Sequence, residues 1–280
     1  MLRHINPYIE ILRPVNFIIA FLSIYLSIVI SNSILKFQLI AFGGSLAGAL
    51  IGGAGMIIND YFDEEIDKIN KPERPIPSGK ISKKNALIYY SSLNILALII
   101  LFFINKYAFI VGLFSELIIS LYSSHLKRTV LIGNFTVAFM TALAFIFGGI
   151  IAGSLRNILF LSVFAFLANF GREVLKDLED IEGDKAKGIK TFPIVFGEKK
   201  SLVLISITWL ILIGVTLLPY ALGIYNGYYL VLIILFVDVI FLWLIRSIWK
   251  NSYRDNLRFI SQIVKYEMLI GLLIVYVGTL

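Results

Sequence analysis

The chain contains no cysteine, and among its 280 residues there are only two histidines. The absence of cysteine excludes disulfide bonds, thiolate metal sites and a cysteine nucleophile. Charged residues are also scarce, at 15% of the chain, whereas hydrophobic residues make up 59%. Because a soluble globular protein carries about 25% charged residues, this composition predicts an integral membrane protein.

Nine apolar runs are each long enough to cross a bilayer as a helix, which takes about 20 residues. They lie at residues 15–34, 37–58, 85–104, 107–124, 134–153, 157–178, 200–222, 227–247 and 258–279. The runs are continuous rather than alternating, which excludes a membrane β-barrel. No linker rich in proline, glycine or serine divides the chain, so we expect a single domain over residues 1–280 with an all-α, polytopic fold.

The basic residues gather on one predicted face of the membrane. With the N-terminus in the cytoplasm, 21 of the 25 lysine and arginine residues fall on the cytoplasmic side, against Lys36, Lys106 and Arg156 outside. Since cytoplasmic loops are enriched in basic residues, we expect a multi-pass protein of the cell membrane with a cytoplasmic N-terminus and an external C-terminus. Topology and anionic lipids account for the net charge of +7, so we expect no nucleic-acid partner.

The first group of acidic residues lies at the cytoplasmic end of the second apolar run. NDYFDEEID, residues 59–67, directly follows 22 residues without a charge. If the helix continues, Asn59, Asp63 and Asp67 form one stripe, with Asp60 beside it. Like charges on one helical face repel each other, so the stripe indicates a bound cation, and hard carboxylate oxygens favour Mg²⁺.

A second group repeats this spacing near the end of the sixth run. In KDLEDIEGD, Lys176, Asp180 and Asp184 are four residues apart, and Asp177 is adjacent to the first of them. A solvated stretch that only sets topology explains one such helix end equally well. Two of them on the same face, each followed by basic residues, favour the binding of a metal ion and a phosphate.

Several basic residues are candidate phosphate ligands. Arg74 stands in KPERPIPSGK, where three prolines restrict the backbone, so its guanidinium is expected to be held as a fork for phosphate oxygens. Lys127 and Arg128 follow the fourth run, and Lys190 follows the second acidic group. A purely topological role predicts the same residues, and the sequence leaves both readings open for Lys127 and Arg128.

These motifs resemble those of the UbiA superfamily of intramembrane prenyltransferases. NDYFDEEID and DIEGD correspond to its two aspartate motifs, and LRPVN, YSSHLKR and GIKTFPIVFG extend the resemblance, in order, over essentially the whole chain. The resemblance implies nine helices around a central cavity that opens to lipid. It also implies that the two motifs bind Mg²⁺ and the diphosphate of an isoprenoid donor, beneath a cap of cytoplasmic loops.

The resemblance further implies roles for individual residues. The expected catalytic metal ligands are Asp60, Asp63, Asp67, Asp180 and Asp184. The expected substrate-binding residues are Asn16, Asn59, Arg74, Tyr122, Lys127, Arg128, Lys176 and Lys190. The chain departs from many relatives at the start of the second motif, where Lys176 and Asp177 replace an aspartate or a Tyr-Asp pair.

Within the superfamily, NDYFDEEIDKINKPERPIPSG and REVLKDLEDIEGDKAKGIKT are most similar to archaeal ether-lipid enzymes. This similarity implies transfer of a geranylgeranyl group from its diphosphate to the hydroxyl of geranylgeranylglyceryl phosphate, a lipid-like acceptor, in contact with membrane lipids. An aromatic or porphyrin-type acceptor is the alternative. A cation transporter is a further alternative, but its ligands are expected near mid-membrane, whereas both acidic groups lie at one face.

Overall fold

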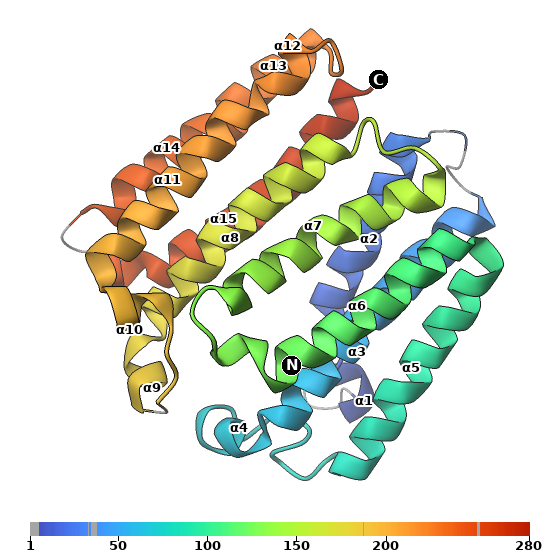
Figure 1. Cartoon of the computed structure of the whole chain (residues 1–280), viewed down its shortest axis with the longest axis vertical. Helices are drawn as coiled ribbons and strands as arrows, with labels where there is room; N and C mark the ends of the chain where they lie inside the picture. The colour runs from blue at the N-terminus through green and yellow to red at the C-terminus, as the bar shows by residue number, and fades with distance from the viewer. Residues whose placement is uncertain (1–5, 33, 35–37, 187, 251–252) are drawn as a thin grey trace. The chain divides into compact units, whose positions relative to one another are not determined.

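A computed structural model describes residues 6–32, 34, 38–186, 188–250 and 253–280, and all regular elements in these ranges are helices (Figure 1). Lys36, assigned above to the external face, lies outside the described residues. Contacts divide the chain into two compact units, the first comprising the segment up to His125 together with Phe147–Ser154, and the second comprising Leu126–Ile146 together with Leu155–Leu280.

The first unit contains six complete helices and the end of a seventh. They are α1 (Pro7–Glu10), α2 (Pro14–Ser31), α3 (Leu39–Phe62), α4 (Glu64–Asn70), α5 (Lys83–Ile104) and α6 (Lys106–Ser124), and α7 (Ile132–Ala152) contributes to both units. The second unit also contains the 3-10 turn η2 (Leu126–Arg128), α8 (Leu159–Glu179), α9 (Ile181–Ala186), α10 (Phe192–Phe196), α11 (Glu198–Thr216), α12 (Leu218–Ala221), α13 (Gly227–Ile233), the π-helical segment η3 (Ile234–Asp238), α14 (Val239–Ile248) and α15 (Tyr253–Gly278).

Eight of the nine predicted apolar runs form helical spans that are long and apolar enough to cross a membrane. The remaining run, 157–178, is helical as α8, but its C-terminal end carries Arg172, Glu173, Lys176 and Asp177. A helix with this many charges does not meet the composition of a membrane span, so the number nine is not confirmed. The expected central cavity and loop cap stay predictions.

The surface of the spans is apolar. On α5, Ile88, Ile95, Phe102 and Phe103 are all more than half exposed. Exposing such a surface to water is unfavourable, whereas contact with lipid tails is favourable. A helix is also suited to lipid because its backbone N–H and C=O groups bond to each other within the helix. The chain is therefore a multi-pass membrane protein.

Small residues on α3 allow close packing in the first unit. This helix contacts α2, α5 and α6. A Cβ added at Gly55 would lie 2.9 Å from Ile119 of α6, and one added at Gly48 would collide with Ile24 of α2. Because lipid provides no hydrophobic drive between helices, close backbone approach at small residues is a main source of association. The packing fixes the C-terminal end of α3, where the first acidic group begins.

In the second unit, α8 contacts α11 and α15, as the adjacent ribbons in Figure 1 show. Gly171 of α8 lies against the fully buried indole of Trp209 on α11. The run predicted at 227–247 is interrupted by the π-helical segment, which ends at Asp238. There the Thr216 hydroxyl donates hydrogen bonds of 3.1 and 3.2 Å to the two Asp238 carboxylate oxygens.

Candidate active site

The backbone of the first acidic motif is helical except at Asp63. This residue (φ −93°, ψ 4°) separates α3 from α4. Its N–H donates to Asn59 O over 3.0 Å, and Asp67 N–H donates to Asp63 O over 2.7 Å, so the four-residue spacing of hydrogen bonds continues across the break. Asn59, Asp63 and Asp67 therefore follow one another at successive turns, as their spacing predicts.

Two arginines bind the carboxylates of this motif within the first unit. Asp60 Oδ1 accepts hydrogen bonds from Arg13 Nη2 at 2.6 Å and from Arg74 Nη1 at 3.0 Å. Arg74 Nη1 also donates to Asp67 Oδ2 at 2.5 Å. The Asp60 side chain is only 2% exposed, so it is a buried anion whose charge is balanced by two guanidinium groups.

Arg13 is a residue of this site that the sequence analysis did not assign. It precedes Pro14 and takes a left-handed conformation (φ 51°, ψ 74°), which starts α2 and places its guanidinium on Asp60. Such a conformation costs a non-glycine residue about 1–3 kcal/mol. In the sequence, a basic residue before an apolar run indicates only membrane topology. The contact with Asp60, 47 positions away, is what identifies Arg13 as a residue of the site.

The proline-rich loop folds compactly around Arg74. Ser78 N–H and its hydroxyl both bond to Arg74 O, at 3.0 and 2.7 Å, and Ile81 N–H bonds to Pro75 O at 2.9 Å. Pro75 and Ile76 are buried. Hydrogen bonds from Ser78 hold the Arg74 backbone, and the guanidinium contacts two carboxylates of the motif in this structure.

The helix α4 is also tied to α5. Glu64 pairs with Lys83 at 2.8 Å and with Lys68 at 3.2 Å. Hydrogen bonds from these two lysines, first from Lys83, lower the pKa of the Glu64 carboxyl below its ordinary value. The pair with Lys83 joins α4 to the start of α5, whereas the pair with Lys68 lies within α4.

The second acidic motif has nearly the same backbone conformation as the first. Asp180 (φ −95°, ψ 8°) separates α8 from α9, as Asp63 separates α3 from α4. Asp180 N–H donates to Lys176 O over 3.0 Å, and Asp184 N–H donates to Asp180 O over 2.9 Å. The equal spacing of the two motifs in the sequence thus corresponds to equal local geometry.

The second motif has its own contacts within the second unit. The Asp177 carboxylate accepts a 2.9 Å hydrogen bond from the Asn134 amide of α7. Lys176 donates to both oxygens of the buried Glu173 carboxylate, at 3.0 and 2.9 Å. Asn134, Asp177 and Glu173 were not among the expected site residues. The sequence signal for Asn134 is its place in LKRTVLIGN, next to the candidate lysine and arginine.

The other candidates are distributed between the two units. In the first unit Asn16 lies on α2 and Tyr122 on α6, and both are half-buried. In the second unit Lys127 and Arg128 form the 3-10 turn η2, and Lys190 is exposed between α9 and α10. Within each unit, the structure places the acidic motif and basic residues on neighbouring segments.

The donor chemistry of the motifs fits Mg²⁺. In the part of the chain that the structure describes, no three acidic or histidine side chains gather closely enough to hold a metal ion. Mg²⁺, however, commonly keeps several waters and binds one or two carboxylates together with substrate phosphates. Asp63 with Asp67, and Asp180 with Asp184, each offer two carboxylates on consecutive helical turns, which is sufficient for binding of this type.

Comparison with known proteins covers nearly the whole chain. A digeranylgeranylglyceryl phosphate synthase of Methanosphaera stadtmanae is 39% identical over 275 residues, which is 98% of this chain and 100% of that protein. A solved digeranylgeranylglyceryl phosphate synthase structure is 34% identical, with a TM-score of 0.85 and coverage of 98% of this chain and 97% of that one.

A UbiA homologue of Archaeoglobus fulgidus, solved with GPP and Mg²⁺ bound, shares the fold at 22% identity and a TM-score of 0.72, covering 96% of this chain and 99% of that one. The model of the UbiA prenyltransferase family matches residues 17–269. The chain therefore belongs to the UbiA prenyltransferase family.

Proposed function

We propose that this protein transfers a geranylgeranyl group from geranylgeranyl diphosphate to the free hydroxyl of geranylgeranylglyceryl phosphate, in the synthesis of archaeal membrane ether lipids. The observation that carries the proposal is the full-length similarity to digeranylgeranylglyceryl phosphate synthases, at 39% identity with one such protein. Both aspartate motifs and the basic segments that follow them are present, at family-like spacing.

Mg²⁺ is the proposed cofactor. Two observations support this assignment. Mg²⁺ is bound together with GPP in the Archaeoglobus homologue, and the two motifs offer carboxylate oxygens as ligands. When bound, it would neutralise charge that develops on the departing diphosphate. Asp63 and Asp67 would hold one ion and Asp180 and Asp184 another, with Asn59 as an additional oxygen contact.

The contacts support a separate role for Asp60. The sequence assigned this carboxylate to the metal, yet its Oδ1 accepts hydrogen bonds from both Arg13 and Arg74. We therefore assign Asp60 to orienting the two guanidinium groups. Asp177 occupies the equivalent position in the second motif and is held by Asn134.

Diphosphate binding is assigned to the basic residues of both units. Arg74 touches Asp67, so a phosphate that shares a metal ion with this carboxylate comes within reach of its guanidinium. Lys127, Arg128 and Lys190 would add positive charge, and Lys176 and the rest of the basic loops suit an acceptor that has its own phosphate. Asn16 and Tyr122 are the proposed polar and aromatic contacts to substrate.

The proposed orientation places the N-terminus and both motifs in the cytoplasm and the C-terminus outside. The 21 basic residues on that side support it. The donor and the acceptor would both enter from the lipid phase, since their chains are apolar.

The acceptor is tested with purified protein, Mg²⁺ and labelled geranylgeranyl diphosphate. We expect product with geranylgeranylglyceryl phosphate and none with 4-hydroxybenzoate. Product with only the aromatic acceptor would overturn the proposed substrate and leave prenyl transfer itself in place. No product with either acceptor, from folded protein, would overturn both.

The ligands are tested by Asp63→Ala and Asp180→Ala. Each is expected to lower turnover by at least about 100-fold, because a fixed charge that acts on the leaving group is lost. Glu65→Ala and Glu182→Ala are the matched controls, since both glutamates are exposed acids within the same motifs. Full activity of either aspartate variant shows that its carboxylate is not an essential ligand.

A further inference from the structure

A buried acid in the second unit has an oxygen without a hydrogen-bond partner. Glu267 lies in α15, within the span Tyr253–Gly278, and is 6% exposed. Among the described residues no group donates to its Oε2. A carboxyl oxygen removed from water without a partner is costly, and more so inside a membrane. A donor other than the described side chains and backbone would relieve this cost.

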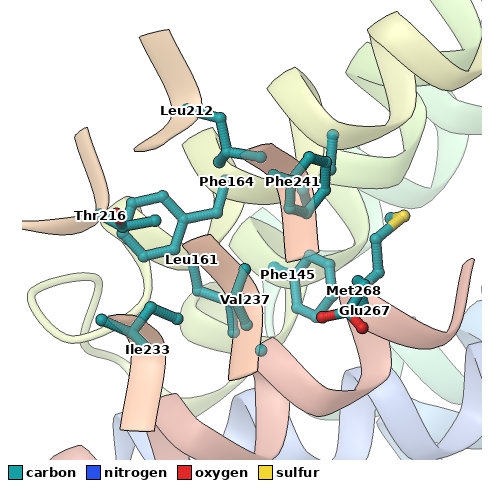
Figure 2. Close-up of a pocket in the computed structure, with 13 residues that line it drawn as sticks. Phe145, Leu161, Phe164, Leu212, Thr216, Ile233, Val237, Phe241, Glu267 and Met268 are labelled. Carbon is teal, nitrogen blue, oxygen red and sulfur yellow. The ribbon is translucent and has the colours of Figure 1, made fainter. Parts of the chain in front are cut away.

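A small cavity adjoins this side chain. It has a volume of about 30 Å³ and is lined by 13 residues of the second unit, among which only Glu267 and Thr216 have polar side chains. Figure 2 shows the Glu267 carboxylate beside Met268 and, in this view, near the ring of Phe145, with Phe164 and Phe241 further along the wall.

The volume decides what the cavity can hold. One water molecule needs roughly 10–15 Å³ of such space, so the cavity has room for about two waters. The unpartnered carboxyl oxygen favours a hydrated cavity over a dry one, because a water can donate to it.

Thr216 provides the second polar contact. Its single hydroxyl hydrogen has two alternative acceptors, Ile213 O at 2.6 Å and the Asp238 carboxylate at 3.1 Å, and its oxygen can accept a hydrogen bond from water. Two waters that bond to each other, one to Glu267 and one to Thr216, have the minimum of two partners that a buried water requires.

We propose that this cavity is a water-binding site inside the membrane-spanning part of the second unit, in which bound water donates to Glu267 Oε2. The site allows a buried acid to stay in a membrane helix. It goes beyond the proposed prenyl transfer, which uses neither Glu267 nor the cavity, and its test does not depend on enzymatic activity.

Gly271 provides a means to fill the cavity. It lines the cavity on α15, and a Cβ added there meets no atom within 4 Å. Gly271→Val is therefore expected to occupy the space of the water. The test measures the Tm of the purified full chain for this substitution in three backgrounds: Glu267, Glu267→Gln and Glu267→Leu.

In the Glu267 and Glu267→Gln backgrounds, Gly271→Val is expected to lower the Tm by about 3 °C or more, because the acid or amide loses its water. In the Glu267→Leu background the same change is expected to leave the Tm equal or raise it. An equal shift in all three backgrounds, of either sign, overturns the proposal, since then nothing couples the cavity to the acid.

Crystals of the unsubstituted chain pressurised with xenon provide a second measurement, which does not depend on the folding of any variant. Xenon occupies dry apolar cavities. We expect no xenon beside Glu267 and density for water there instead. Xenon bound in this cavity would overturn the proposal.

Discussion

Asp60 and Asp177 illustrate what decides a role at the scale of single residues. Each stands one position after the first residue of its stripe, and each is held by a side chain that is distant in sequence, Arg13 for Asp60 and Asn134 for Asp177. The two aspartates therefore anchor their motifs, whereas Asp63 and Asp180 lie at the helix breaks. We therefore propose that a like-charged cluster in the sequence contains acids with two different functions.

Arg13→Met tests this anchoring. The change removes a 2.6 Å ion-paired hydrogen bond from a buried carboxylate, so we expect unfolding to become easier by about 1.5–3 kcal/mol. We also expect weaker Mg²⁺-dependent binding of inorganic diphosphate, because Asp60 then has Arg74 as its one remaining arginine partner and holds that guanidinium more tightly. Thermal unfolding and calorimetric titration measure the two effects.

Lys80→Met is the control for this variant. Lys80 pairs with Glu10 at 3.4 Å, and both side chains are more than one third exposed, so its loss is expected to cost less than about 1 kcal/mol. An Arg13→Met protein as stable as the Lys80→Met protein contradicts the anchoring role.

At the scale of elements, the second unit depends on a close contact between α8 and α11. Gly171 has no side chain, and the buried Trp209 indole occupies the space where one would lie. This contact fixes α8, which ends in the second acidic motif. Hydropathy locates both helices but contains no information on which glycine faces which ring.

Gly171→Ala is expected to destabilise the protein by about 1–3 kcal/mol, because the new methyl group collides with Trp209 and forces the helices apart. Thermal unfolding measures the effect. Gly214→Ala on α11 is the matched control, since a Cβ there meets no atom within 4 Å, and it is expected to be neutral or stabilising. Equal Tm values for the two variants contradict the packing argument.

At the scale of the whole molecule, the proposed reaction requires the motif of the first unit and that of the second to act on one donor. The chain offers a clean test because it contains no cysteine. Glu65→Cys and Glu182→Cys, at exposed positions within the two motifs, would provide the only thiols for spin labels.

With Mg²⁺ and an isoprenoid diphosphate present, the distribution of distances between the two labels is expected to become narrower and shorter. This expectation follows from the proposal that ions held by the two motifs share one diphosphate. Pulsed electron paramagnetic resonance measures the distribution. The same double variant with Asp63→Ala is the control, in which the ligands are expected to change the distribution less. A distribution that the ligands leave unchanged contradicts the shared site.

The sequence by itself determined the membrane class, the approximate helix boundaries and the two aspartate motifs. These properties depend on local quantities: apolar length against bilayer thickness and the four-residue spacing of side chains along a helix. The helix break that the two motifs share, at Asp63 and at Asp180, was not predicted from this spacing.

Only the tertiary structure decided which side chains hold the acids and where space is left. The pairing of Arg13 with Asp60, the contact of Gly171 with Trp209, and the cavity beside Glu267 each join residues that are far apart in the chain. Their energies depend on distance and burial, which composition and periodicity do not contain. The π-helical segment that ends at Asp238 likewise lies within an apolar run whose pattern predicts a regular helix.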